Sequence, residues 1–376
     1  MKIAIVLNTS WNIYNFRMSF IKSLLAEGHE VHTVAPIDNY TQRLIEAGCI
    51  HHNVRMDSRG ANAIRDFGLV IEFWSIYRHI RPDVVLHFTI KPNIYGTLAA
   101  AMLKIPVINN VCGLGTVFLK KGIVSQIATR LYKWAFRYPK KVFFQNADDQ
   151  QLFLERKLVP GNIADLLPGS GVDLSRFVPA PSGKNEKFTF LLISRLITDK
   201  GVLEFIEAVK ELKAKGINAR FQVLGPKDPE HKRGIKLKTI NQWIDTGLIE
   251  YLGTTDDVRQ FINKADCVVL PSYREGTPRT LLEAASSAKP IIATDVPGCH
   301  HVVVNNYNGL LCKLKDSRDL AEKMQNMVNL DANVLRQMGE NGRKKMELEY
   351  SEDIVIRKYI AAILQFRKVN AATLAS

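Results

Sequence analysis

The feature that most constrains the fold of this chain is a regular alternation of short β-branched apolar runs with longer segments of helical periodicity. In the first half, strands are predicted near 2–8, 30–35, 83–88, 106–110 and 141–145, and helices near 15–26, 62–80, 93–103 and 123–138. Such a βαβ pattern predicts a parallel sheet covered by helices on both faces.

The pattern pauses once and then repeats. Val178–Lys187 is rich in Pro, Gly, Ser and charged residues, the composition of a linker. Beyond it, strands are predicted near 188–193, 219–224, 248–252, 266–270 and 290–294, with helices near 201–215, 232–244, 256–263 and 279–288. We predict a first domain at 1–178, a linker at 179–187, a second doubly wound domain at 188–350, and a C-terminal helix at 351–376 that is a candidate to brace the first domain.

The composition agrees with two folded domains and raises one question about partners. A length of 376 residues is enough for two cores at about 150 residues each. The hydrophobic and charged fractions of 46% and 23% exclude disordered and collagen-like chains. The net charge of +14 favours nucleic acid, an anionic membrane surface or a phosphorylated substrate as a partner.

The sequence lacks the patterns of a transmembrane segment, a signal peptide, a disulfide framework and a metal site. It has no apolar run long enough to span a bilayer, and the first apolar run ends at Asn8, too early for a signal peptide. Five scattered cysteines predict neither a disulfide framework nor a thiolate zinc site, which favours a reducing cytoplasm. No Asp-x-Asp spacing is present, so neither a metal nor another cofactor is predicted.

The segment from Leu270 to Ala284 carries the strongest chemical signal. An apolar strand leads through a loop at 276–279 into a helix, whose N-terminus would present backbone N–H groups to an anion. Glu275 and Glu283 flank this loop eight residues apart, so one can accept hydrogen bonds from a sugar and the other from a ribose. The alternatives are a solvated loop charge for Glu275 and a helix-dipole partner for Glu283.

A second signal lies where the strand near 188–193 ends. Arg195 and Lys200 follow that strand and precede the next helix. They could neutralise the two phosphates of a nucleotide leaving group as its charge develops. The alternative is a solvated Lys200 and an Arg195 paired with a nearby carboxylate. Because open α/β sheets bind ligands at the carboxyl ends of their strands, we expect the site in a cleft between the domains.

These motifs resemble the retaining GT-B glycosyltransferases of family four. The resemblance rests on the Arg195…Lys200-Gly201 loop, the Glu275-x7-Glu283 pair, Pro271-Ser272-x-x-Glu275-Gly276, Pro168…Asp173-x-x-x-Phe177 and Asp295-Val-Pro-Gly298. In the first half, Tyr14–Met18, Tyr40–Gln42, Lys91-Pro-Asn93-x-x-Gly96 and Gly113-Leu-Gly115 are similar to the bacterial branch that extends polyprenyl-diphosphate-linked sugars.

The resemblance implies a fold of two Rossmann-like domains facing across a cleft and a role for each motif. Arg195 and Lys200 would bind the donor diphosphate, Glu275 the transferred sugar and Glu283 the ribose. The rest of the donor site would be Gly276, Thr277, Arg279, Thr280 and Leu281. Acceptor or first-loop candidates are Asn8, Thr9, Asn15, Arg17, Lys91, Asn93, Gly113 and Gly115. In this family the acceptor attacks on the face that the leaving phosphate occupies, so no separate base is sought.

The sequence departs from the family pattern at three places. The loop after the first strand is Asn8–Asn12 instead of a glycine-rich turn. His301 stands where relatives usually carry a glutamate, and we interpret His300 and His301 as surface or supporting side chains. Asn109, Asn110 and Cys112 occupy the region where relatives often have a histidine, so no catalytic histidine is transferred.

Part of the positive charge is concentrated in the segment 120–141. Ile123, Ile127, Leu131 and Trp134 recur there at helical spacing among basic residues. A basic amphipathic helix with aromatic residues suits anionic lipid, although a core helix with a solvated basic face is the alternative. The candidate membrane-docking residues are Lys120, Lys121, Arg130, Lys133, Trp134, Arg137 and Lys140.

Together these features predict a metal-independent, retaining enzyme that moves a sugar from a UDP-sugar to a polyprenyl-diphosphate-linked saccharide. It would lie in the cytoplasm, on the inner face of the membrane. A UDP-sugar 2-epimerase of the same architecture is one alternative, and a nucleic-acid-binding protein is another. The second is disfavoured because the charge is spread evenly, with 21 basic and 13 acidic residues up to 178 and 30 and 24 after it.

Overall fold

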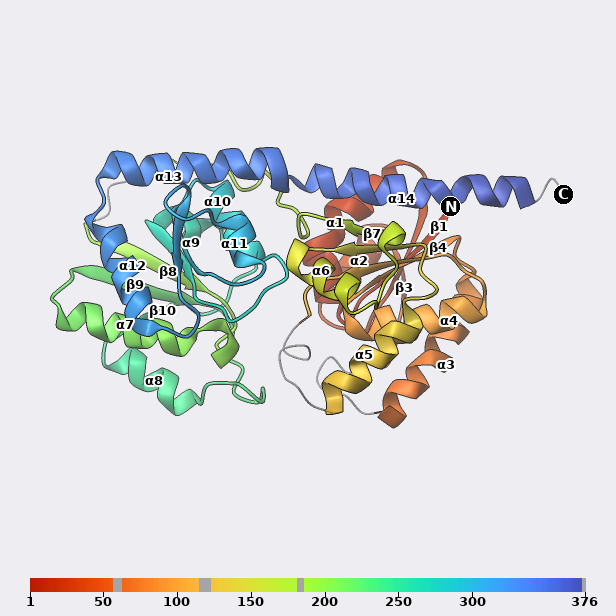
Figure 1. Ribbon diagram of the computed structural model, residues 1–376, viewed down its shortest axis with the longest axis horizontal. Coiled ribbons are helices and arrows are strands. Elements are labelled where there is room, and N and C mark those ends of the chain that lie inside the picture. The colour runs from red at the N-terminus through yellow and green to blue at the C-terminus, as the bar shows by residue number, and fades with distance from the viewer. Residues whose placement is uncertain (57–62, 115–122, 181–185, 374–376) are drawn as a thin grey trace. The chain divides into compact units, whose positions relative to one another are not determined.

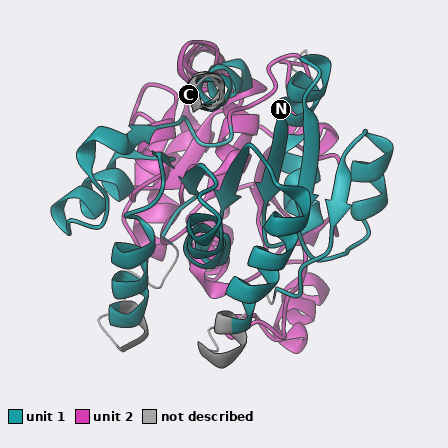
Figure 2. Cartoon of the chain, turned by 90° about the vertical axis from the view of Figure 1, so that its right-hand side faces the viewer, with its two compact units in different colours: residues 1–170, 352–376 teal, residues 171–351 magenta. Residues whose placement is uncertain are grey.

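The computed structural model describes residues 1–56, 63–114, 123–180 and 186–373. The chain divides into two compact units, Met1–Ser170 with Glu352–Ser376, and Gly171–Ser351 (Figures 1 and 2). Each unit is built on its own parallel sheet, as the alternating sequence pattern predicts. None of the helices in these described ranges has the length and hydropathy needed to cross a membrane.

The first unit contains a sheet with strand order β3-β2-β1-β4-β5-β6-β7 and parallel pairing throughout. Its strands are β1 (Lys2–Val6), β2 (Glu30–Val34), β3 (Ile50–His52), β4 (Val84–Phe88), β5 (Val107–Val111), β6 (Lys141–Phe144) and β7 (Ala164–Leu166). Its helices are α1 (Ser10–Ala26), α2 (Thr41–Glu46), α3 (Ala63–Ile80), the π-helix η1 (Pro92–Gly96), α4 (Thr97–Met102), α5 (Ile123–Ala135), α6 (Ala147–Glu155), the short η2 (Gly161–Ile163) and α14 (Glu352–Thr373).

The second unit has the strand order β10-β9-β8-β11-β12-β13, again all parallel. Its strands are β8 (Phe188–Ile193), β9 (Ala219–Leu224), β10 (Glu250–Tyr251), β11 (Cys267–Leu270), β12 (Ile291–Thr294) and β13 (Gly309–Cys312). Its helices are η3 (Thr198–Lys200), α7 (Val202–Ala214), α8 (Leu237–Asp245), α9 (Arg259–Lys264), α10 (Arg279–Ser286), α11 (Cys299–Val302), α12 (Ser317–Asn329), α13 (Ala332–Lys345) and the π-helix η4 (Met346–Tyr350).

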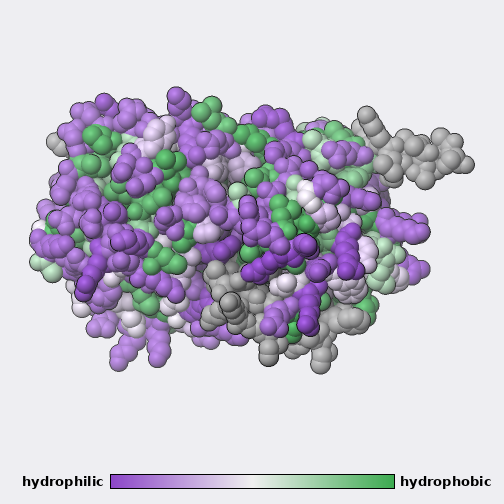
Figure 3. Space-filling view, viewed as in Figure 1, coloured by the Kyte–Doolittle hydropathy of each residue, from purple (hydrophilic) through white to green (hydrophobic). Residues whose placement is uncertain are grey.

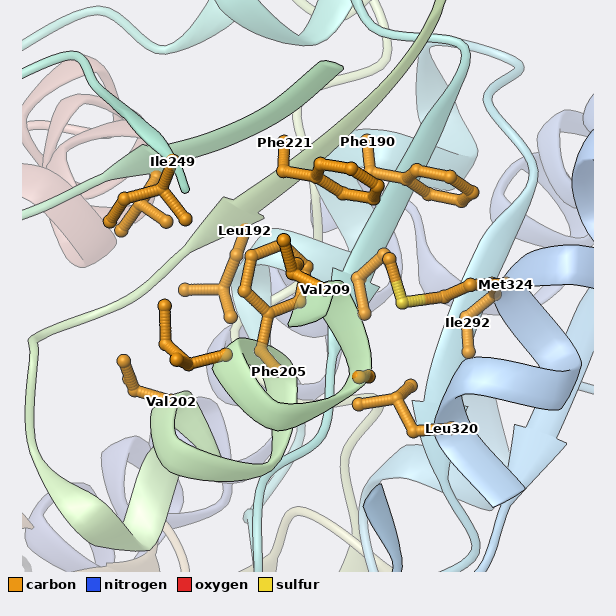
Figure 4. Close-up of a cluster of buried hydrophobic side chains, with 14 of the residues drawn as sticks. Phe190, Leu192, Val202, Phe205, Val209, Phe221, Ile249, Ile292, Leu320 and Met324 are labelled. Atoms are coloured by element: carbon orange, nitrogen blue, oxygen red, sulfur yellow. The ribbon is translucent and has the colours of Figure 1, made fainter. Parts of the chain in front are cut away.

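Both faces of each sheet are buried, which explains the continuous apolar strands. On β1, Ile3 and Ile5 pack with α1 and α14, whereas Ala4 and Val6 pack with α3 and α4. In the second unit, Phe190 and Leu192 of β8 point into a core formed with α7 and α12 (Figure 4). The ring of Phe190 stacks there on that of Phe221, with centroids 5.8 Å apart.

The C-terminal helix α14 packs against the first unit. Tyr359 donates a hydrogen bond of 2.6 Å from its hydroxyl to Asn110 Oδ1, and its ring contacts those of Phe20 and Phe143. Lys358 donates to the carbonyl of Leu166 at 2.7 Å. This helix therefore fills a face of the first sheet with side chains from the far end of the chain.

The unit boundary lies earlier than the predicted linker at 179–187. Residues 171–178 belong to the second unit instead of the first. Val172 and Phe177 are buried in the core of that unit, and the N–H of Val172 donates to the Tyr350 carbonyl at 2.9 Å. The Pro- and Gly-rich residues that suggested a linker come after this packed segment. The boundary predicted from them therefore lies later in the chain than the boundary between the two units.

Several elements differ from the sequence prediction. The first helix begins at Ser10, not near 15, because the Thr9 hydroxyl accepts a hydrogen bond from the Asn12 N–H as an N-cap. The short strands β3, β7 and β13 were missed. They have only three or four residues each, and β3 and β7 carry polar side chains, so neither of those two has the apolar run by which a buried strand is detected.

Candidate active site

The predicted donor motifs follow two adjacent strands at the point where the second sheet changes winding direction. Chain order runs outward from β8 to β9 on one side and from β11 to β12 on the other. The loop 194–201 follows β8 and the loop 271–278 follows β11. Such a switch point is where doubly wound sheets bind ligands.

Two glycines allow these loops to lie against each other. Gly201 has φ +69°, and a Cβ at this position would overlap the carbonyl of Pro271. Gly298, with φ +86°, lies against the carbonyls of Glu275 and Gly276 in the same way. The loops after β8, β11 and β12 are therefore in direct backbone contact, a packing that only glycine permits.

Lys200 and Glu275 form an ion pair between the first two loops. Ser272 donates its hydroxyl hydrogen within this cluster, with Glu275 Oε1 at 2.7 Å and the Asp199 carbonyl at 3.2 Å. The N–H of Tyr273 donates to the same carbonyl at 2.9 Å. Since the side chains of Lys200 and Glu275 are only 24% and 13% exposed, the pair is held in place by its surroundings.

Arg195 is the more exposed of the two predicted cations. Its side chain is 54% exposed, and its nearest carboxylate oxygen, on Asp228, is 3.9 Å away. A solvent-accessible guanidinium with so long an ion pair can turn to a ligand at little cost. The alternative of a solvated Lys200 is wrong, because Lys200 is largely buried and paired with Glu275. The alternative of an Arg195 near a carboxylate agrees with its position beside Asp228.

Glu283 lies on α10 and is paired along its own helix. Arg279 Nε donates to Glu283 Oε1 at 2.8 Å, and the glutamate side chain is 12% exposed. Burial raises the pKa of Glu283, while the positive charges of Arg279 and Arg176 act in the opposite direction. A cavity of about 320 Å³ in the same unit is lined by Arg176, Phe177, Val178, Asp257, Arg259, Gln260, Asn263 and Ser287, without Glu283.

The start of α10 differs in part from the predicted phosphate cradle. The N–H of Leu281 already donates to the Pro278 carbonyl at 3.0 Å, and its side chain is buried. The Thr280 hydroxyl donates to the Ile193 carbonyl at 3.4 Å, which joins α10 to the end of β8. Gly276, Thr277 and Arg279 remain at the loop and the first turn, where a phosphate could approach the backbone.

Three residues of the site were given no role by sequence reasoning. The Ser272 hydroxyl contacts both the Glu275 carboxylate and the Asp199 carbonyl, and so links the β11 loop to the β8 loop. Ser272 and Asp199 both stand within the motifs identified in the sequence, but no role was predicted for either. Arg233 forms an ion pair with Asp199. No local pattern marks Arg233, because the contact joins residues 34 positions apart.

In the first unit, the winding direction changes between β1 and β4. Asn8 and Thr9 follow β1, while Lys91 follows β4, at this edge of the sheet. Asn8 Oδ1 accepts from Asn12 at 3.1 Å, and Asn15 Nδ2 donates to the Trp11 carbonyl at 3.0 Å. The expected first-loop side chains thus stabilise the start of α1 and lie where this sheet would bind a ligand.

Two expected acceptor residues, Arg17 and Asn93, are buried and contact neighbouring side chains and backbone. Arg17 is 4% exposed, with its guanidinium 4.4 Å from the Phe88 ring centroid. Asn93 is 1% exposed and donates to the Asn110 carbonyl at 2.7 Å. Arg17 thus packs against the end of β4, and Asn93 is hydrogen-bonded to the end of β5. Gly113, with φ +112°, follows β5 at the same edge, and Gly115 lies outside the described residues.

The helix α5 turns a mixed apolar and basic face outward. Tyr132, Ala135 and Phe136 pack inward, whereas Ile127, Trp134 and the following Tyr138 are 51%, 50% and 45% exposed. The same stretch exposes the predicted basic residues Arg130, Lys133, Arg137 and Lys140. Lys120 and Lys121 lie outside the described residues.

Comparison with known proteins identifies the family. Residues 176–345 match the model of the glycosyl transferases group 1, and residues 2–146 match that of the glycosyl transferase 4-like proteins. An N,N'-diacetylbacillosaminyl-diphospho-undecaprenol alpha-1,3-N-acetylgalactosaminyltransferase from Campylobacter jejuni is 30% identical over 96% of this chain and 97% of its own length.

Other relatives agree with this match. A UDP-Gal:alpha-D-GlcNAc-diphosphoundecaprenol alpha-1,3-galactosyltransferase from Escherichia coli is 26% identical over 77% of this chain and 76% of its own. The structure of HepE from Anabaena in complex with UDP and glucose superimposes with a TM-score of 0.79 at 17% identity, over 97% of this chain and 99% of that one. The chain belongs to the group 1 glycosyltransferases and has the GT-B fold that its motifs predicted.

Proposed function

We propose that this glycosyltransferase moves a sugar from a UDP-sugar to a polyprenyl-diphosphate-linked saccharide, with retention of configuration and without a metal. The observation that carries the donor half is the Lys200–Glu275 ion pair, which joins the loops after β8 and β11 at the switch point of the second sheet, with Glu283 on the helix α10 that follows. The acceptor class is supported by the undecaprenol-linked substrates in the names of two relatives.

In the proposed donor complex, Lys200 and Arg195 bind the diphosphate and Glu275 binds hydroxyls of the transferred sugar. The ammonium of Lys200 has three N–H donors, so it can hold a phosphate oxygen while it remains paired with Glu275. Charge accumulates on the diphosphate as the bond to the sugar breaks, and the two cations stabilise that charge. No metal is needed for this part of the reaction.

In the transfer step, the bond between the anomeric carbon and the UDP oxygen breaks. The acceptor hydroxyl oxygen forms a new bond on the same face of the sugar, and its proton passes to the departing phosphate oxygen. The roles left to the protein are to hold the donor and to stabilise the diphosphate, which is what the residues around Lys200 can do.

Nucleotide binding and transfer provide the first test. We expect saturating UDP at about 100 times its Kd to stabilise the protein by roughly 2.7 kcal/mol. Glu283→Ala should weaken UDP binding by about 10- to 100-fold, because hydrogen bonds to a charged group are lost. Glu340→Ala, which removes a surface carboxylate 3.8 Å from Arg336, is the matched control and should leave UDP binding unchanged.

A panel of UDP-sugars with short polyprenyl-diphosphate-linked N-acetylglucosamine and diacetylbacillosamine then tests the acceptor class. Transfer should persist in EDTA, and nuclear magnetic resonance should show an α-linked product from an α-linked donor. A β-linked product would exclude retention, and loss of activity in EDTA would exclude metal independence. If no UDP-sugar bound at all, the proposed function would be wrong.

The outward face of α5 supports peripheral binding to an anionic membrane. Most of the surface in Figure 3 is hydrophilic, with small scattered hydrophobic patches. The exposed Trp134 and Ile127 can enter the headgroup region, while Arg130, Lys133 and Arg137 meet lipid phosphates. This placement suits an acceptor whose lipid chain is held in the bilayer.

Liposome flotation tests the membrane proposal. The triple reversal Arg130→Glu, Lys133→Glu and Arg137→Glu should weaken binding to vesicles of phosphatidylglycerol and phosphatidylethanolamine more than a hundredfold, at about 1 kcal/mol per basic residue. The control Lys232→Glu, Lys236→Glu and Lys238→Glu changes the net charge equally on exposed residues of the second unit. Equal loss in both variants would indicate nonspecific attraction, and unchanged binding in the first would contradict the proposal.

A further inference from the structure

Arg279 and Glu283 form a side-chain pair inside the proposed donor site. They stand one turn apart on α10, with Arg279 Nε 2.8 Å from Glu283 Oε1. The two side chains are 20% and 12% exposed. A glutamate so shielded from water is costly to keep ionised without a partner.

The charges around Glu283 come from three elements. Arg279 is on the same helix, Arg176 precedes the second sheet, and Asp257 lies before α9. Hydrogen bonds from Arg259 lower the pKa of Asp257 to about 2, so this carboxylate stays negative and opposes the ionisation of Glu283. Arg176 is exposed, which leaves Arg279 as the shielded cation that directly contacts the glutamate.

We propose that Arg279 is a positioning residue, whose side chain keeps Glu283 ionised and fixed so that it accepts hydrogen bonds from the ribose of the donor nucleotide. This inference rests on the proposed UDP-sugar function. A ribose diol offers two hydroxyl donors, and a carboxylate accepts from both, whereas a protonated carboxyl has its own hydrogen to place. Arg279 thereby extends ribose recognition to lower pH than a Glu283 without this partner would allow.

The pH dependence follows from the charge balance. Burial already raises the pKa of Glu283, and Arg279 counteracts that effect. Without the guanidinium, Glu283 takes up a proton at higher pH, so UDP binding is lost as the pH falls. In the unmodified protein Arg279 opposes this rise, so the loss of UDP binding begins at lower pH than in the variant.

Calorimetric titration with UDP between pH 5.5 and 8.5 tests this role. We expect Arg279→Gln to bind UDP about tenfold more weakly at pH 8, and to lose up to a further tenfold per pH unit below the new pKa of Glu283. Arg279→Lys should restore part of the pH profile, because it returns the charge without the Nε geometry. Arg336→Gln, on the exposed Arg336–Glu340 pair, is the matched control and should follow the unmodified protein.

A second background separates positioning from direct contact. Glu283→Gln cannot ionise, so adding Arg279→Gln to it should cost little further affinity and introduce no pH dependence. An equal loss from Arg279→Gln in both backgrounds, flat with pH, would show that Arg279 contacts UDP itself and would overturn the proposal. Failure of the unmodified protein to bind UDP would instead reject the donor assignment. Far-ultraviolet circular dichroism of each variant verifies that the overall secondary-structure content is unchanged.

Discussion

Lys200→Met should lower kcat for sugar transfer by about a thousandfold, the upper range for removing one group that stabilises developing charge. Lys200 is part of the loop after β8, and its ammonium contacts Glu275 in the loop after β11. The donor diphosphate is proposed to bind at this pair. Without Lys200, the departing diphosphate loses a cation that would stabilise its negative charge. Glu275, whose side chain is 13% exposed, also loses its ion-pair partner. Initial rates of product formation at saturating donor and acceptor measure the effect.

Two further variants make this result specific. Lys210→Met, on the same unit, removes an exposed lysine paired with Glu207 and should keep full activity. Lys200→Arg retains a positive charge and should recover UDP affinity more than kcat, because the ammonium geometry at Glu275 changes. A Lys200→Met enzyme that kept more than a tenth of the normal kcat would rule out the proposed role of this cation.

Gly201→Ala should destabilise the second unit by roughly 3–5 kcal/mol and abolish UDP binding. The residue has φ +69°, and the added methyl group would overlap the Pro271 carbonyl at the start of the β11 loop. The methyl group can be accommodated only if the loop that carries Glu275 moves away. Urea unfolding and UDP titration measure the two effects.

Gly216→Ala is the matched control, since Gly216 has nearly the same φ, +72°, and no atom would lie within 4 Å of its Cβ. It should cost only the left-handed backbone strain of about 1–2 kcal/mol and leave UDP binding intact. If the two alanine variants behaved alike, the close approach of the β8 and β11 loops would not be what requires glycine at 201.

The alternation of apolar strands and helices was sufficient to predict both sheets. Strands buried on two faces are nearly continuous apolar runs, so β1, β8 and β11 are visible in the sequence. The edge strand β3, which contains His51 and His52, is not visible in the sequence. It is defined by its pairing with β2 and not by a buried apolar run. The boundary at Gly171 was also missed, because Val172 and Phe177 join the second core through contacts distant in sequence.

For the candidate site, the sequence identified the motifs but not the contacts between them. The spacing of Glu275 and Glu283, together with the two cations at 195 and 200, is enough to indicate a pair of anion-binding loops. The burial of Arg17 and Asn93 could not be predicted, since it depends on contacts of Arg17 with β4 and of Asn93 with β5, and neither contact joins neighbours in sequence.

By itself, the sequence determined the class of fold and the donor motifs, because hydrophobic periodicity and loop composition are local properties. Only the tertiary structure decided how those motifs are paired. Lys200 meets Glu275 across 75 positions, and Asp199 joins them through Ser272. Such contacts depend on the parallel register of β8 and β11, which brings the ends of two strands distant in sequence to one edge of the sheet.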